Sequence, residues 1–356
     1  MRTNRLGSTG LIVSELCLGA MTFGDNGGRF GAVAGLDQPA STGLVKQAID
    51  AGINFIDTAN VYSDGRSEQF VGQALKDLGL ARHEIVIATK ALGPMGKGPN
   101  DSGMSRGHLM VQIDASLARL GLDHVDLYQI HGWDALTPIE EALRALDDIV
   151  RSGRARYIGV SNWAAWQIVK ALGISERLGL EKFASLQAYY TLAGRDLERE
   201  IVPMLASEGL GLMVWSPLAG GLLSGKYRRS DEGKNEGAKL VGEGRRAAFD
   251  FPPVDADRAY NLIDAMDAMA AGKGCTVAQI ALAWLLYQPT VSTVIVGAKR
   301  TDQLADNIGA CDVTLSADDM AQLEALSALP REYPGWMLAT QGSYRGKASS
   351  LRRVAE

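Results

Sequence analysis

The chain has 356 residues, of which 46% are hydrophobic and 22% charged, and its formal net charge is −5. This length allows one large α/β barrel or two ordinary domains. Acidic and basic residues are interspersed, so no basic stripe is available to neutralise phosphates, and we expect no nucleic-acid partner.

The sequence also lacks the usual signs of a membrane, secreted or metal-dependent protein. No apolar run approaches the ~20 residues of a bilayer span, and the N-terminal MRTNRLGSTG lacks the hydrophobic stretch of a signal peptide. We therefore expect a cytoplasmic protein without a membrane partner. Cys17, Cys275 and Cys311 lie far apart and in apolar contexts, which indicates buried thiols. No two histidines have the helical spacing of metal ligands, so no metal site is expected.

Short apolar runs alternate with longer amphipathic stretches, which is typical of βα units around a parallel sheet. Strands are expected at 15–18, 54–57, 85–90, 125–131, 155–161, 184–188, 211–216 and 293–296. Helical periodicity is found, for example, at 42–51, 68–78, 109–120, 138–152, 197–208 and 276–287. Because no change in composition or linker divides these units, we predict a single (β/α)8 barrel.

Several segments fall outside this alternation. Residues 6–11 place a turn between two short apolar pieces, which predicts a hairpin that plugs the N-terminal end of the barrel. Residues 91–107, 218–254 and the tail from 330 are too long to be simple connections, and we expect them to carry function. One domain is predicted over 1–356, with the barrel at about 5–326 and a C-terminal tail at 327–356.

Four residues form the main functional signal. Asp57, Lys90 and His131 end three successive expected strands, and Tyr62 lies in the loop after the first of these. The strand C-termini of a parallel barrel meet at one rim, so these side chains should converge. A tyrosine that gives up a proton near neutral pH needs a neighbouring cation, and a buried lysine needs a carboxylate. His131 would donate to a carbonyl oxygen. Taken singly, each residue could be a surface or capping residue; together they indicate a carbonyl reductase that uses a nicotinamide cofactor.

Several motifs carry a resemblance to a known family. NFIDTANVYSDGRSE, IATK, DLYQIH, RYIGVSNW, VWSPLAGGLLSGKY and IVGAKRTDQLADN resemble, in order and spacing, those of the aldo-keto reductase superfamily, from about Arg5 to Leu326. The resemblance implies NADPH bound across the C-terminal mouth of the barrel without a Rossmann domain. No GxGxxG motif follows the first strand, in agreement with this expectation.

The resemblance also implies roles for the four residues. Tyr62 is the general acid, and Lys90, paired with Asp57, lowers the pKa of the tyrosine. His131 orients the carbonyl group, and the nicotinamide delivers hydride to the carbonyl carbon.

The cofactor residues implied by the resemblance fall into four groups. Ser161, Asn162 and Gln187 would hold the carboxamide and Trp215 would stack on the ring, although Ser161 and Asn162 could instead cap the next helix. Gly19, Met21 and Asp57 line the ring side; the family often has Gly-Thr in the first loop, so a hydroxyl contact is in doubt where this chain has Gly19–Ala20–Met21–Thr22. The pyrophosphate group comprises Ser216, Leu218, Gly221 and Lys226. The adenosine group comprises Gly297, Lys299, Arg300, Gln303, Asp306 and Asn307.

Two adjacent cations suggest which cofactor is preferred. Lys299 and Arg300 precede a helix N-terminus, which favours the 2′-phosphate of NADPH over NADH. They could also be a solvated pair. Asp306 would suit the adenine or ribose and would oppose a nearby phosphate.

Aromatic residues suggest the substrate. Met21, Phe23, Trp133, Trp163 and Trp336 would form a wall suited to a bulky apolar carbonyl compound. The tail EYPGWM resembles that of bacterial family members acting on ketones of sizeable sugars, phenolics or polycyclic metabolites, including keto forms of trichothecene mycotoxins. Ordinary packing is the alternative for these aromatics.

Three functions fit the sequence. The first is a reductase of aldehydes or ketones, reversible with NADP+. The second is an NADPH-binding regulatory subunit with little turnover, because potassium-channel β subunits resemble the same barrel; they carry asparagine in place of His131, so the complete tetrad favours turnover. The third is a stress-related binding protein with incidental activity. The sequence does not fix the physiological substrate, the preferred direction, the stereochemistry, the strictness for NADPH or the oligomeric state.

Overall fold

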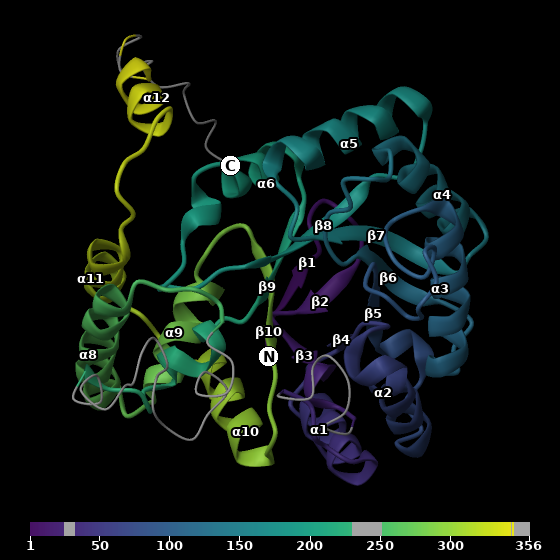
Figure 1. The fold of residues 1–356 in the computed structure, drawn as a ribbon. Helices are drawn as coiled ribbons and strands as arrows, with labels where there is room; N and C mark the ends of the chain where they lie inside the picture. The colour runs from purple at the N-terminus through teal and green to yellow at the C-terminus, as the bar shows by residue number, and fades with distance from the viewer. Residues whose placement is uncertain (25–32, 230–250, 343, 345–356) are drawn as a thin grey trace, which may run out of the picture.

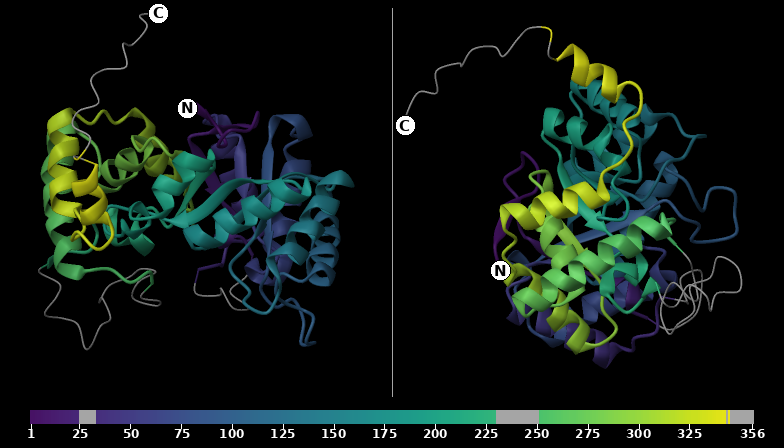
Figure 2. Two further views of the ribbon diagram at one scale, coloured as in Figure 1. Left: turned by 90° about the horizontal axis from the view of Figure 1, so that it is seen from above. Right: turned by 90° about the vertical axis from the view of Figure 1, so that its left-hand side faces the viewer.

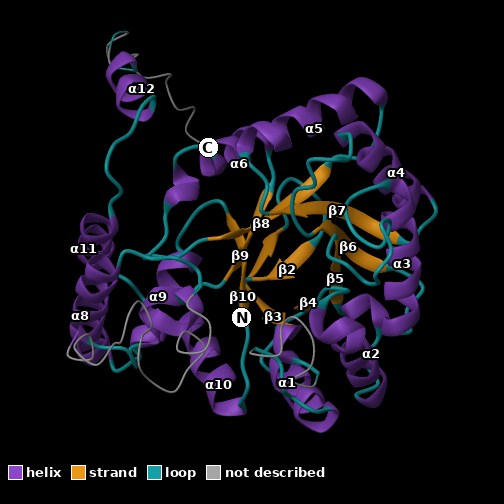
Figure 3. Ribbon diagram, in the orientation of Figure 1, coloured by secondary structure: helices purple, strands orange, loops and turns teal. Residues whose placement is uncertain are grey.

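The computed structural model describes residues 1–24, 33–229, 251–342 and 344. Eight parallel strands form a closed barrel in the order β10-β3-β4-β5-β6-β7-β8-β9, surrounded by helices (Figures 1 and 3). The predicted (β/α)8 barrel is therefore confirmed. A separate antiparallel pair, β1 and β2, precedes it.

Each strand of the barrel is short and each is followed by helical structure. The barrel strands are β3 Leu16–Gly19, β4 Phe55–Asp57, β5 Val86–Ala91, β6 Val125–Ile130, β7 Ala155–Ser161, β8 Phe183–Tyr189, β9 Gly211–Trp215 and β10 Val291–Val296; the separate pair is β1 Thr3–Arg5 and β2 Ile12–Ser14. The α-helices are α1 Gln38–Asp50, α2 Arg66–Asp77, α3 Arg106–Leu120, α4 Ile139–Arg151, α5 Ala165–Leu178, α6 Ile201–Glu208, α8 Ala256–Lys273, α9 Val277–Leu286, α10 Thr301–Gly309, α11 Ala317–Ser327 and α12 Gly335–Gln341.

Alternate residues of the strands face the inside and the outside of the barrel, as the pleat of a β-strand requires. On β3, Cys17 joins an interior apolar cluster with Phe55 of β4, whereas Leu16 and Leu18 belong to the larger core between strands and helices. The interior cluster also contains Val86, Ala88, Leu127, Met213 and Ile295. The part of the barrel interior that lies toward the N-terminal hairpin is therefore apolar, and polar side chains are concentrated nearer the strand C-termini.

The N-terminal hairpin plugs the barrel. Leu6 and Val13 are fully buried and join the interior cluster, and the backbone N–H of Ser8 donates to the Gly209 carbonyl at 2.8 Å. Figure 2 shows this hairpin at the opposite end of the barrel from the segment 92–105. The loops at the C-terminal rim are thus left to form a site.

The observed elements differ from the expected ones mainly at their ends. The helix expected over 197–208 is a 3-10 turn at Asp196–Glu198 followed by α6, which begins at Ile201. Pro203 explains this start, because proline fits only the first turn of a helix. In the tail, α12 extends away from the barrel beyond α6 (Figures 1 and 2). Most of the long segment expected over 218–254, and residues 345–356, lie outside the described residues.

Within the described residues, no single helix combines the length and apolar composition that crossing a membrane requires; only α8 and α9 taken together, bent by 96°, pass such a test. The same part of the chain holds no group of three or more His, Cys, Asp or Glu side chains placed to bind a metal ion.

The contact between α2 and α3 gives a first prediction. A Cβ added at Gly72 of α2 would lie 2.2 Å from the Leu120 carbonyl oxygen, whereas a Cβ at Gly173 of α5 would meet nothing within 4 Å. We expect Gly72→Ala to lower the free energy of unfolding by about 1–3 kcal/mol through overpacking. Gly173→Ala should raise it by about 0.5–1 kcal/mol, because alanine favours a helix. Urea unfolding measures both, and equal stability of the two variants would reject this account of the contact.

Candidate active site

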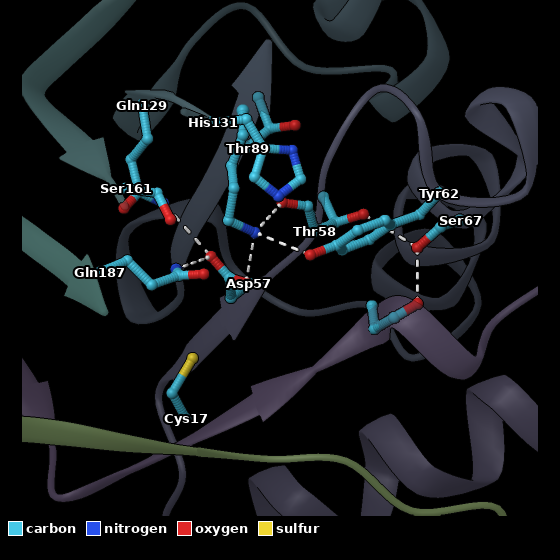
Figure 4. A network of polar contacts seen from close by, with 12 residues as sticks. Cys17, Asp57, Thr58, Tyr62, Ser67, Thr89, Gln129, His131, Ser161 and Gln187 are labelled. Atoms are coloured by element: carbon cyan, nitrogen blue, oxygen red, sulfur yellow. Dashed lines mark hydrogen bonds and ion pairs between the residues drawn. The ribbon is translucent and has the colours of Figure 1, made fainter. Parts of the chain in front are cut away.

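A buried ion pair lies at the centre of the C-terminal rim. The Lys90 ammonium at the end of β5 donates to Asp57 Oδ2 at 2.6 Å and to the Thr58 carbonyl oxygen at 2.7 Å (Figure 4). Lys90 is 0% exposed and Asp57 is 3% exposed. Burial by itself lowers the pKa of Lys90, but the charges of Asp57 and Tyr62 and the hydrogen bonds to them outweigh it, so the pKa is raised. Lys90 is therefore a cation at neutral pH.

Tyr62 lies next to this cation. Its hydroxyl is 3.4 Å from Lys90 Nζ, and the Nζ atom is 4.9 Å from the centre of the phenol ring. The ring of His131, which follows β6, meets the Tyr62 ring edge-on with centroids 5.7 Å apart. Figure 4 shows Asp57, Tyr62 and His131 close together. The structure thus brings together the four residues that the sequence singled out.

The turn that carries Tyr62 has an unusual backbone. Ser63, Asp64 and Gly65 all have positive φ angles, of 48°, 53° and 92°. Two of them are not glycine, and such residues store strain unless the surroundings hold them. The Ser63 hydroxyl donates to the Phe23 carbonyl at 2.9 Å, which ties the turn to the loop after β3. Tyr62 is thus held by a constrained turn, not by regular secondary structure.

Two amide groups hold the second oxygen of Asp57. Gln187 Nε2 donates to Asp57 Oδ1 at 2.9 Å, and Gln129 Nε2 donates to the same atom at 3.3 Å. Gln187 was predicted as a cofactor residue, whereas no role was predicted for Gln129. A signal was present, because Gln129 is a polar residue at an inward position of the otherwise apolar end of β6.

The residues expected at the nicotinamide lie together at the rim. Asn162 has a φ of 58°; its backbone N–H donates to the Gln187 carbonyl at 3.1 Å, and its Nδ2 donates to Ser161 Oγ at 3.0 Å. The Trp215 indole donates to Asn162 Oδ1 at 3.0 Å. Helix α5 is capped by Ala164, so the alternative in which Ser161 and Asn162 cap it is wrong.

Trp215 itself contacts two aromatic rings. The Phe251 ring is nearly parallel to it, at an angle of 9° and a centroid distance of 6.0 Å, and the Tyr189 ring is tilted at 5.2 Å. These contacts fix the plane of the indole at the edge of the site.

The segment expected at the pyrophosphate forms a tight glycine-containing turn after β9. Ser216 Oγ accepts from the Gly220 N–H at 3.0 Å, and the Leu218 carbonyl accepts from the Gly221 N–H at 2.9 Å. Gly221 has a φ of 95°, and a Cβ added there would lie 3.7 Å from Lys226 Nζ. Partial burial, and secondly the charge of Arg300, lowers the pKa of Lys226. The cations of the two expected phosphate segments are therefore close enough to affect each other.

The residues after β10 form the expected adenosine segment, and Lys299 and Arg300 make separate contacts there. Lys299 Nζ donates to the Ala34 carbonyl at 3.1 Å, and its backbone N–H donates to Gln303 Oε1 at 3.0 Å. Arg300 binds both carboxylate oxygens of Asp302 at 2.9 Å.

The rest of this segment is held by the helices beside it. Asp306 accepts from Thr276 Oγ1 at 3.0 Å, which links α10 to the start of α9. Asn307 is buried, and Gly297 follows β10 directly.

The first loop joins two sides of the rim. A Cβ at Gly19 would lie 2.8 Å from a methyl carbon of Ile295, which explains a glycine where β3 meets β10. Met21 packs on the small cluster that contains Tyr62, and Thr22 Oγ1 donates to the Ala298 carbonyl at 2.9 Å.

The expected aromatic wall is only partly assembled. Phe23 and Trp163 are 0% and 2% exposed, and the Trp163 indole donates to the Gly132 carbonyl, so both belong to the core and not to an accessible wall. Trp133 is half-buried and meets Trp163 edge-on at 4.8 Å. Trp336 lies on α12, away from the barrel, with Tyr333 as its aromatic neighbour at 6.0 Å. The structure therefore leaves Trp133 and Met21 as the wall residues near the tetrad.

Comparison with known proteins agrees with this geometry. The profile of the Aldo/keto reductase family matches residues 15–328. A probable voltage-gated potassium channel subunit beta of Oryza sativa subsp. japonica is 37% identical over 92% of this chain and 96% of its own length. Versiconal hemiacetal acetate reductase of Aspergillus parasiticus is 35% identical over 94% of this chain and 99% of its own. Norsolorinic acid reductase A of the same species is 33% identical over 89% of this chain and 78% of its own. With a barrel of this topology and a family match over nearly its whole length, the chain belongs to the aldo/keto reductase family.

Proposed function

We propose that this oxidoreductase is an NADPH-dependent carbonyl reductase that reduces aldehydes or ketones and, with NADP+, oxidises the corresponding alcohols. The observation that carries the proposal is the Lys90 cation, held by Asp57 and placed 3.4 Å from the Tyr62 hydroxyl. A structural ion pair would need only a carboxylate and an ammonium. A phenol added to that pair, with an imidazole beside it, suits proton transfer.

The four side chains divide the work. The Lys90 charge favours the phenolate form of Tyr62, so the tyrosine can give its proton to the alkoxide that develops during reduction. Asp57 holds Lys90 in its charged form, and Gln129 and Gln187 fix Asp57. His131 would donate to the carbonyl oxygen and orient it toward Tyr62. The bound nicotinamide supplies the hydride that forms the new C–H bond.

The rim residues fit a nicotinamide dinucleotide. Asn162 and Gln187 offer amide groups beside the tetrad, and Trp215 offers a fixed aromatic plane. The left-handed Gly220 and Gly221 let backbone N–H groups approach a phosphate, and Lys226 adds positive charge. For the far end, Lys299 and Arg300 are proposed to bind the 2′-phosphate. Arg300 would have to exchange Asp302 for the phosphate, and this exchange would limit the preference for NADPH.

A bulky ketone is the proposed substrate class. Relatives at 33–35% identity are named for reduction of versiconal hemiacetal acetate and norsolorinic acid. Trp133 provides a half-buried aromatic surface next to His131 that would suit an extended apolar molecule.

An NADPH-binding interaction subunit is the second candidate, because a relative at 37% identity is named as a probable channel β subunit. The complete tetrad favours the enzyme, since a binding subunit has no need of an activated phenol. A single domain over 1–356 and a cytoplasmic location stay predictions.

The proposal is tested by following NADPH oxidation with purified protein and a panel of aromatic aldehydes, sugar aldehydes, α-diketones and polycyclic ketones, repeated with NADH. The proposal expects turnover with NADPH, highest with bulky ketones. Tight NADPH binding without turnover of any compound would instead support the interaction subunit.

Removal of the Tyr62 hydroxyl tests the acid. We expect Tyr62→Phe to lower kcat at least about 100-fold while NADPH binding is kept, because the hydroxyl acts on the developing alkoxide. The matched control is Tyr128→Phe, a buried tyrosine whose hydroxyl donates to the Leu109 carbonyl. If Tyr62→Phe keeps more than about a tenth of wild-type kcat, a loss below ~1.4 kcal/mol, Tyr62 is not the acid.

Removal of the two adenosine-side cations tests the cofactor preference. The double change Lys299→Ala and Arg300→Ala should raise the Kd for NADPH about tenfold or more and leave that for NADH nearly unchanged, because only NADPH carries the 2′-phosphate. Fluorescence titration measures both constants. The control is Arg144→Ala, which breaks an exposed salt bridge between Arg144 and Glu140 on α4. Equal weakening of both cofactors would rule out the 2′-phosphate role.

A further inference from the structure

We propose that Glu68 is a positioning residue that sets the separation between Lys90 and Tyr62. The proposal rests on the function proposed above, because it concerns how Tyr62 is held for proton transfer. Glu68 follows the tyrosine motif in the sequence, is 0% exposed on α2, and accepts hydrogen bonds from Thr89 and Arg119. Its influence would act through the two elements that carry them.

One oxygen of Glu68 is bound to the lysine strand. Thr89 Oγ1 donates to Glu68 Oε1 at 2.5 Å, and Thr89 is the residue before Lys90 on β5. Both groups are fully buried. A buried carboxylate bound at this point of β5 fixes the first turn of α2 relative to the backbone from which the lysine side chain leaves.

The other oxygen is bound to Arg119, which packs against the turn that follows Tyr62. Arg119 Nε of α3 donates to Glu68 Oε2 at 2.6 Å. The same arginine lies against Gly65, where an added Cβ would be 2.7 Å from Arg119 Cδ. Gly65 ends the left-handed turn that begins after Tyr62. The arginine therefore packs directly on the turn whose backbone strain needs support.

A neighbouring set of contacts supports the same geometry. Ser67 Oγ donates to the Ala20 carbonyl at 2.7 Å and lies 2.9 Å from Thr58 Oγ1, and the Thr58 carbonyl accepts from Lys90 (Figure 4). The start of α2 is thus joined to the lysine site through Ser67 and through Glu68. Glu68 differs from Ser67 in that it links the lysine strand to Arg119, which packs on the tyrosine turn.

The direction of the effect separates positioning from simple electrostatics. The charged or titratable groups near Tyr62 include Lys90, Asp57 and His131, with Asp64 and Arg66 in the turn that follows it, and Glu68 is paired with Arg119. Replacing Glu68 by glutamine removes a negative charge and leaves Arg119 positive. Through space, the loss of this negative charge and the uncompensated positive charge of Arg119 would both favour the phenolate and move the titration of Tyr62 to lower pH. Loss of the Lys90 contact would move it to higher pH. The positioning role therefore predicts the opposite sign.

The experiment compares Glu68→Gln and Thr89→Val with Asp147→Asn. Asp147 is a buried carboxylate of α4 that binds Arg151 and the Glu181 N–H, so it matches Glu68 in burial and partners but lies on another helix. Tyrosine labelled with 13C at Cζ allows the Tyr62 titration to be read by NMR without any substrate, with the signal assigned from Tyr62→Phe. Thermal unfolding and NADPH affinity are measured on the same samples.

We expect the Tyr62 titration to move up by about one pH unit in Glu68→Gln and by a smaller amount in Thr89→Val. With a carbonyl substrate, kcat should fall roughly 10- to 100-fold, the alkaline limit of the kcat profile should move in the same direction, and KM and the Kd for NADPH should change little. Asp147→Asn should lower thermal stability without moving the titration.

An unchanged or lowered Tyr62 titration in both Glu68→Gln and Thr89→Val overturns the proposal. So does the same upward shift in Asp147→Asn, which would make the effect one of general destabilisation. Thr89→Val removes only a hydroxyl and carries the test if Glu68→Gln does not fold. Failure of the proposed function shows separately, as absence of turnover by the wild-type protein.

Discussion

The buried ion pair of Asp57 and Lys90 is the constraint on which the rest of the site depends. Removing two charges from water costs several kcal/mol for each, and the cost is recovered only with close contact and further hydrogen bonds. Here Lys90 has Asp57, the Thr58 carbonyl and the Tyr62 hydroxyl around it, while Asp57 also accepts from Gln129 and Gln187. Because the cost of burying the two charges can exceed the attraction between them, stabilisation of the fold does not by itself explain this pair. Its position beside the Tyr62 phenol is the arrangement that the proposed proton transfer requires.

The barrel makes this arrangement possible. Asp57, Lys90 and Gln187 lie far apart in the sequence, and only the closed parallel sheet brings the ends of β4, β5 and β8 to one rim. The apolar cluster and the hairpin plug occupy the other end, so the polar groups lie on the side of the C-terminal rim. The same barrel is shared by relatives named as reductases and as channel subunits, so the fold does not decide between these functions. That decision belongs to the tetrad and the surfaces around it.

The sequence predicted the parts of the molecule that depend on local pattern. Strand ends were predictable because an apolar run stopped at a polar residue, and this rule placed Asp57, Lys90 and His131 correctly at the rim. Contacts between distant side chains were not predictable in this way: the link from Glu68 to Thr89 and Arg119 joins three elements and leaves no periodic signal. The wall positions predicted for Phe23 and Trp163 were wrong, since an aromatic residue after a strand can face the core as easily as a pocket. The position of Trp336 depended on where α12 lies, which a short tail motif does not specify.

We propose that this chain catalyses hydride transfer from a nicotinamide to a carbonyl carbon and does not merely bind the dinucleotide. The most direct measurement incubates the protein with a panel of carbonyl compounds and with NADPH that carries deuterium at both C4 positions, and analyses the alcohol formed by mass spectrometry and NMR. We expect one deuterium per product molecule, on the former carbonyl carbon, and a hydroxyl proton from water. Alcohol formed without deuterium at that carbon, or no alcohol from any carbonyl compound despite saturation with NADPH, would contradict it.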